Sequence, residues 1–157
     1  MRAALVAVAL LAAGCGRSGS DERPQPVPPG RAAELLHERV WLDHLPRSMT
    51  DKFHVALFDV GGAGITQHRS VWKGDFELFF HEVDGGELAF VLPASGTEMR
   101  STFHIVPITG HGEADLMLVI DHPPTGPREY LGLPAHRGHA DVATVDAWLA
   151  RRYPTRR

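Results

Sequence analysis

The feature that most constrains the fold is a pattern of alternating residues that runs from Trp72 to Leu92. Large apolar side chains occupy every second position over much of this stretch, which is typical of β-strands with one buried face. They are Phe76, Leu78, Phe80, Leu88, Phe90 and Leu92. Asp84, Gly85 and Gly86 separate the two halves of the pattern, and glycine adopts the backbone angles of a tight turn at low cost. The stretch therefore predicts a β-hairpin.

The length of the loop decides which side chains of this hairpin face the core. A two-residue loop, Gly85-Gly86, places Leu88 and Phe90 on the face of His81. A three-residue loop with one left-handed glycine instead gathers all six apolar side chains on one face. We favour the three-residue loop, because a slip of one residue turns a whole apolar set toward water. The polar side chains expected to point outward are then Glu77, His81 and Glu87.

The rest of the folded part reads as further short strands. Besides the two strands of the hairpin, the expected strands cover residues 37–42, 53–60, 65–73, 99–109, 115–121 and 128–133. Eight short strands joined mostly by tight turns are typical of an antiparallel meander that closes as a barrel or folds into a sandwich. Residues 141–152 predict one C-terminal α-helix, with Asp141 as its cap and an apolar stripe that includes Val145, Trp148 and Leu149.

The expected strand at residues 65–73 has no clean apolar face. Such a strand is either an exposed edge that polar residues protect from further pairing, or a wall that supplies polar contacts to a cavity. We favour the edge. If the strand lines a cavity, Gln67 and Arg69 are the expected donors to an acidic ligand.

The first 14 residues are typical of a secretory signal, with Arg2 followed by an apolar run too short to span a bilayer in the mature protein. The run ends in Ala12-Ala13-Gly14-Cys15, which resembles the lipobox of bacterial lipoproteins. The resemblance implies that Cys15 is acylated and anchors the protein in a membrane, and Gly16 implies the outer membrane. The alternative is an ordinary secretion signal that contains a cysteine.

Composition then separates a tether from a folded domain. Residues 15–32 contain the expected acylated cysteine and a stretch rich in glycine, serine and proline, which predicts a flexible tether. Residues 33–153 are expected to form one barrel domain, because they are enough for one core and too few for two. The chain has one cysteine, so we expect neither an internal disulfide nor a catalytic thiol. Its formal net charge of -3 argues against a nucleic-acid partner.

A meander of this size, with Trp41 on its first strand and a lone helix after its last, resembles the lipocalin and calycin group. The resemblance implies an eight-stranded up-and-down barrel whose mouth takes small apolar ligands. It also implies an arginine stacked across the tryptophan, and Arg128 occupies the matching place. Arg128 with Tyr130 further resembles the Arg-x-Tyr that grips a ligand carboxylate in intracellular fatty-acid-binding proteins. The alternative is that Arg128 closes the barrel over Trp41 and that Tyr130 packs within its strand.

Ten histidines require metal binding to be considered. A zinc or copper site needs three or four converging ligands. His81 and His104 are expected on outward faces of separate strands, and the loop groups have no spacing of a known site. Those groups are His111 with Glu113 and Asp115, and His136 with His139 and Asp141. We therefore expect no metal and no cofactor.

No catalytic motif is present either, since the sequence has no Gly-x-Ser-x-Gly elbow and no phosphate-binding loop. We expect a non-catalytic lipoprotein of the outer membrane that binds a small apolar or acyl-bearing molecule inside the barrel. Its expected polar contacts are Arg128, Tyr130, Arg69 and Gln67. The expected interior lining is Phe76, Phe80, Phe90, Phe103, Leu116, Leu118 and Ile120. The alternative is a solid barrel or sandwich that serves as a scaffold for an envelope protein partner, because eight strands can be filled by their own side chains.

Overall fold

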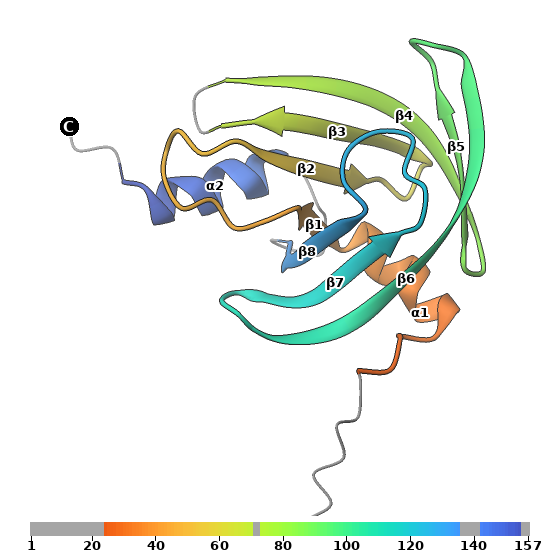
Figure 1. Cartoon of the computed structure of the whole chain (residues 1–157), viewed down its shortest axis with the longest axis horizontal. Coiled ribbons are helices and arrows are strands. Elements are labelled where there is room, and N and C mark those ends of the chain that lie inside the picture. Colours follow the sequence, from red (N-terminus) through yellow and green to blue (C-terminus); the bar gives the residue numbers. More distant parts are fainter. Residues whose placement is uncertain (1–23, 71–72, 136–141, 155–157) are drawn as a thin grey trace, which may run out of the picture.

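The computed structural model describes residues 24–70, 73–135 and 142–154. Within these ranges the strands pair in sequence order and the last strand pairs with the first, which closes an antiparallel up-and-down barrel (Figure 1). The predicted fold class is confirmed, including the C-terminal helix. The signal segment, Cys15, Trp72 and the histidine loop at residues 136–141 lie outside the described residues.

Two helices accompany the strands, α1 before the barrel and α2 after it. The elements are α1 (Pro29–His37), β1 (Arg39–Leu42), β2 (Phe53–Phe58), β3 (Ala63–Arg69), β4 (Gly74–Asp84), β5 (Glu87–Leu92), β6 (Thr97–His111), β7 (Ala114–Ile120), β8 (Glu129–Pro134) and α2 (Val142–Arg152).

The hairpin of β4 and β5 has the two-residue loop, so the expected three-residue loop is wrong. Asp84 lies opposite Glu87, and His81 lies opposite Phe90. Gly85 has a φ of 58°, the left-handed backbone that a tight hairpin turn requires at this position.

This register reverses the two faces of β4. Phe76, Leu78 and Phe80 are 66%, 57% and 56% exposed, so their expected place in the interior is wrong. Phe79 and His81 are 2% and 7% exposed, so the expected outward position of His81 is also wrong. Glu77, also expected outward, is half-buried on the face of Phe79, whereas Glu87 is exposed as expected.

A glycine on the neighbouring strand explains why β4 turns Phe79 inward. A Cβ added at Gly64 would lie 2.1 Å from the Phe79 ring, so the ring occupies the space that this glycine leaves open. The same ring meets Phe58 and Phe90 edge-on, with centroid distances of 5.3 and 5.6 Å. Such edge-to-face contacts are favoured between aromatic rings.

Helix α1 is the element that the sequence analysis missed, because it lies partly in the expected tether and partly in the expected first strand. Proline stands at its start, where a missing N–H costs nothing. Its Ala32, Leu35 and Leu36 are buried in the same cluster as the inward side chains of the barrel. The Trp41 indole N–H donates to the Leu36 carbonyl oxygen over 2.9 Å. Helix α1 therefore closes the core from one side.

Helix α2 packs on the outside of the barrel, and Figure 1 shows it well apart from α1. Its predicted stripe of Val145, Trp148 and Leu149 is buried in a second cluster. The strand residues of that cluster point away from the barrel core and include Val40 and Leu42. Strand β3 pairs with both β2 and β4, so its expected position as a sheet edge is wrong.

Candidate functional site

Buried side chains that contact one another occupy the interior of the barrel. Phe90 and Phe103 are 3% and 5% exposed and belong to the core cluster that α1 completes. Leu116, Leu118 and Ile120 of β7 are buried in the same cluster, as expected. A small eight-stranded barrel can pack in this way without leaving a cavity.

Arg128 does not stack on Trp41, so the contact implied by the lipocalin resemblance is absent. Arg128 lies one residue before β8, is largely exposed, and pairs with Asp121 over 3.1 Å. The Trp41 ring instead packs against the backbone of β8, because a Cβ added at Gly132 would lie 2.7 Å from it.

Tyr130 does not share a site with Arg128. Its side chain is buried in the core, and this burial, together with the nearby charge of Asp43, raises the pKa of the phenol. One member of the expected carboxylate clamp is therefore on the surface and the other is inside the protein.

Arg69 contacts helix α2, and Gln67 contacts Arg69. The Arg69 guanidinium donates to the Gln67 amide oxygen over 3.3 Å and to the Asp146 carboxylate of α2 over 2.9 Å. These contacts join β3 to α2 on the outer surface.

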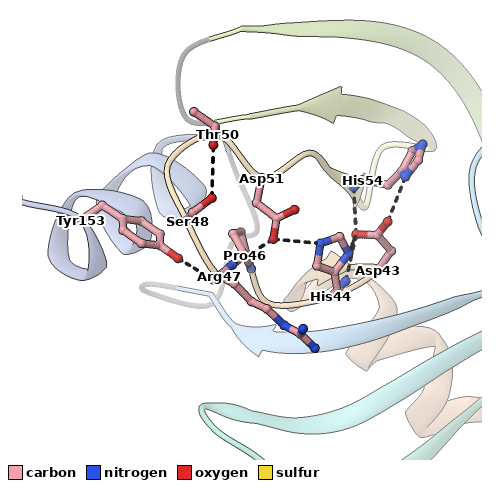
Figure 2. A network of polar contacts seen from close by, with 9 residues as sticks. All are labelled: Asp43, His44, Pro46, Arg47, Ser48, Thr50, Asp51, His54 and Tyr153. Atoms are coloured by element: carbon pink, nitrogen blue, oxygen red, sulfur yellow. Dashed lines mark hydrogen bonds and ion pairs between the residues drawn. The ribbon is translucent and has the colours of Figure 1, made fainter.

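The loop between β1 and β2 holds a network of carboxylates and imidazoles (Figure 2). The Asp43 carboxylate lies 2.9 Å from Nδ1 of His54 and 2.9 Å from Nδ1 of His44. Nε2 of His44 lies 3.5 Å from the Asp51 carboxylate. Figure 2 also shows the Tyr153 hydroxyl directed at the loop, where it donates to the Pro46 carbonyl oxygen. These contacts fix the conformation of the loop and join it to the chain directly after α2.

Neither a catalytic triad nor a metal site arises from these groups in the described residues. The Ser48 hydroxyl in this loop contacts Thr50, 3.3 Å away, rather than an imidazole. No three histidine, cysteine, aspartate or glutamate side chains within the described ranges are placed to hold a metal ion. His81 points into the core, and His136, His139 and Asp141 lie outside the described residues.

The buried His81 lies against the half-buried His37 of α1. Their Nε2 atoms are 3.3 Å apart, and Nδ1 of His81 is buried with no hydrogen-bond partner in the described structure. Burial, reinforced by the charge that His37 carries when protonated, lowers the pKa of His81 to about 4. Burial also lowers the pKa of His37.

A cavity of about 430 Å³ lies between α2 and the outer wall of the barrel. Its volume falls within the range of small-molecule sites. Most of its lining is apolar. The lining residues are Val40, Leu42, Glu113, Leu133, Pro134, Ala135, Thr144, Val145, Trp148 and Arg151.

One donor in the wall of this cavity lacks a hydrogen-bond acceptor in the described part of the chain. The Trp148 side chain is 4% exposed, and its indole N–H has no hydrogen-bond acceptor among the described residues. A buried donor without an acceptor costs about 1–3 kcal/mol. The indole nitrogen itself is not accessible from the cavity, so a molecule in the cavity contacts the Trp148 ring and reaches this donor only if the ring turns. The apolar stripe of α2 predicted that Trp148 faces the barrel, but the sequence carries no sign of the space beside it.

Comparison with protein families, with curated proteins and with solved structures finds no match to this chain. Neither helix of the described part is long and apolar enough to cross a membrane.

Proposed function

We propose that the protein is a lipid-anchored lipoprotein of the outer membrane that holds a small acyl-bearing molecule without catalysis. The binding site is the cavity between α2 and the barrel wall, in place of the barrel interior. The observation that carries the proposal is an apolar cavity of about 430 Å³ beside the Trp148 ring, whose buried indole N–H has no acceptor among the described residues.

The chemistry of the lining favours an acyl chain with a terminal oxygen acceptor. Val40, Leu42 and Val145 offer apolar surface to the chain, and each buried methylene contributes about 0.8 kcal/mol. The proposal requires the Trp148 ring to turn on binding, so that its buried indole N–H donates to the carbonyl or carboxylate oxygen. Arg151 contributes a guanidinium to the same lining. No step of this binding requires a nucleophile, a metal or a cofactor.

Calorimetric titration with decanoate tests the site. Trp148→Phe keeps an aromatic ring and removes the donor, so we expect decanoate to bind about tenfold to a hundredfold more weakly, since a hydrogen bond to a charged group contributes about 1.5–3 kcal/mol. Val145→Phe fills the cavity and is expected to abolish binding. His104→Ser, on an exposed position of β6, is the control and should bind like the wild type.

A second candidate function, a solid scaffold for an envelope protein, is favoured by the filled core of the barrel. Native mass spectrometry of protein purified from its own host separates the two candidates. A co-purifying acyl compound that Trp148→Phe weakens supports the carrier. Its repeated absence, together with equal decanoate binding by wild type and both cavity variants, supports the scaffold.

A further inference from the structure

The outer wall of β3, β4 and β5 carries an exposed apolar stripe formed by Phe76, Leu78, Phe80 and Val91. These four side chains are 66%, 57%, 56% and 37% exposed. Phe80 lies opposite Val91 across the strand pair, so the stripe continues from β4 onto β5. On the other side, Leu78 lies opposite the half-buried Ile65 of β3. A contiguous set of large apolar side chains on an outer face marks an interaction surface.

Another part of the outer wall, formed by β1 and β2, shows that apolar side chains on the outside of this barrel can be covered by a helix. There, Val40, Leu42 and Val55 are at most 1% exposed, because they share a buried cluster with the apolar residues of α2. No element of the described structure covers the apolar stripe in the same way. We therefore infer that the apolar stripe contacts a partner outside the domain.

A basic hollow of about 580 Å³ lies at the Phe76 end of the stripe. It is lined by Lys52, His68, Arg69, Ser70, Lys73, Gly74 and Asp75. Lys52 and Lys73 have no ion-pair partner among the described residues, whereas Arg69 pairs with Asp146. Three cationic side chains face one carboxylate, Asp75, in this hollow. It therefore suits an anionic group, and Gly74 and Asp75 lead directly along β4 into Phe76.

We propose that the apolar stripe and the basic hollow together dock on the surface of a phospholipid bilayer. Phenylalanine and leucine side chains would enter the boundary between headgroups and acyl chains, and the two lysines would bind headgroup phosphates beside them. Apolar side chains next to basic ones are the composition of interfacial membrane-binding surfaces. A protein partner would have to match both features, whereas any anionic bilayer presents acyl chains and phosphates side by side.

The length of chain between Cys15 and the domain is also compatible with docking on a bilayer. This argument rests on the proposed lipid anchor at Cys15. Near the start of the described residues, the Val27 backbone N–H donates to the Ile105 carbonyl oxygen of the barrel. About a dozen residues separate Cys15 from Val27, and an extended chain of that length reaches about 40 Å. An acylated Cys15 would hold the domain close enough to the bilayer for the stripe to touch it.

Vesicle binding without the anchor tests the docking face separately from the lipoprotein proposal. The probe is large vesicles of phosphatidylethanolamine and phosphatidylglycerol. The background is the expected mature chain, residues 15–157, with Cys15→Ser, which cannot be acylated and lacks the apolar segment at residues 1–14. Combined Phe76→Ser, Leu78→Ser and Phe80→Ser is expected to lower the partition coefficient more than tenfold. Lys52→Gln with Lys73→Gln should lower it about fivefold per lysine and flatten its salt dependence. His104→Ser on β6 is the matched control and should partition like the background.

The same background contains no cysteine, so single cysteines can be spin-labelled to report depth in the bilayer. A label at Leu78→Cys is expected to become accessible to oxygen and protected from a water-soluble nickel reagent when vesicles are added. A label at His104→Cys should stay accessible to nickel. Thermal melts by circular dichroism verify that each variant folds, and the substituted side chains that lie within the described residues are exposed.

Three results would overturn the docking proposal. One is equal partitioning of the background and the triple apolar variant. Another is a Leu78→Cys label that stays accessible to nickel on vesicles. The third is a dimer, or a complex with a protein, that the triple variant breaks while no vesicle binding is seen. Mass spectrometry of the native protein tests acylation of Cys15, so loss of the anchor proposal leaves the vesicle result standing.

Discussion

His81 is the residue whose environment departs furthest from what its chemistry prefers. Its imidazole is packed against Phe58 and Phe79, with ring centroids 5.2 and 5.9 Å away, and burial lowers its pKa from 6.5 to about 4. The unfolded chain therefore binds a proton between pH 6.5 and pH 4 that the folded protein does not. Folding stability contributed by neutral His81 is fully present above pH 6.5 and falls as the pH drops toward 4.

We predict that the free energy of unfolding falls by roughly 1–3 kcal/mol between pH 7 and pH 4 because of this group. His37 adds to the change in the same direction, since its pKa is lowered too. Urea denaturation at a series of pH values measures the change. His81→Phe should remove most of this dependence, while the exposed His104→Gln should keep it. An unchanged slope in His81→Phe would show that other groups cause the acid sensitivity.

At the level of single elements, the hairpin of β4 and β5 can be tested by its two glycines. Gly85 has a φ of 58°, whereas Gly86 does not have a positive φ, and a Cβ added to Gly86 would lie 3.8 Å from the nearest atom. We predict that Gly85→Ala lowers the free energy of unfolding by about 1–2 kcal/mol, because an L-residue is strained in the left-handed region.

Gly86→Ala is the matched control for this hairpin, and it is expected to change stability by less than about 0.5 kcal/mol. Thermal and urea unfolding of both variants measure the difference. If the two substitutions cost the same, or if Gly86→Ala costs more, the two-residue loop is not the one that the protein uses in solution.

The same hairpin shows why part of the fold could not be read from the sequence. Strand β4 has large apolar side chains on both faces, Phe76 and Leu78 on one and Phe79 on the other, so local alternation does not choose between them. The choice is made by the space beside Gly64 on a neighbouring strand, which is a tertiary effect. The expectation that Phe76, Leu78 and Phe80 lie on the buried face was wrong, because Phe79 is buried in their place.

The two helices also differ in how well the local sequence predicts them. Helix α2 was predictable, because Val145, Trp148 and Leu149 form a stripe with helical spacing and basic residues follow in the last turn. Helix α1 has nine residues and follows a proline-rich segment, and a helix of this length is marginal on its own. Its stability comes from burying Leu35 and Leu36 against the barrel, which no local pattern reveals. The cavity beside Trp148 likewise depends on how α2 packs against the barrel wall, which the sequence pattern does not reveal.

On the scale of the whole molecule, the strands of the barrel form three apolar surfaces. In the described structure, helices cover two of these surfaces. Helix α1 covers the core, with Leu36 at 0% exposure, and α2 covers the outer wall at Val40 and Leu42. The wall of Phe76, Leu78 and Phe80 stays exposed. The strand pattern was sufficient to predict a closed sheet, because eight alternating segments with short connections have few other ways to bury one face.

Removing α1 should therefore affect the entire barrel rather than one end of it. A chain that begins at Arg39 loses Leu35 and Leu36, and burial of a leucine contributes about 1.5–3 kcal/mol. The loss of roughly 3–6 kcal/mol is a large share of the 5–15 kcal/mol that is typical of a whole domain. It also leaves the Trp41 indole N–H without its acceptor on Leu36. We predict that this chain melts at a much lower temperature and binds the hydrophobic dye ANS.

A chain that begins at Pro24 is the control for this truncation, because it keeps Val27 and all of α1. It should melt within a few degrees of the full chain and bind no more ANS than the full chain does, since the backbone bond from Val27 to Ile105 and the buried face of α1 are intact. Equal melting temperatures for the Pro24 and Arg39 chains would mean that the barrel core is complete without α1. A core of that kind would have to close over Trp41 by itself, and the filled interior described above would not depend on the helix at all.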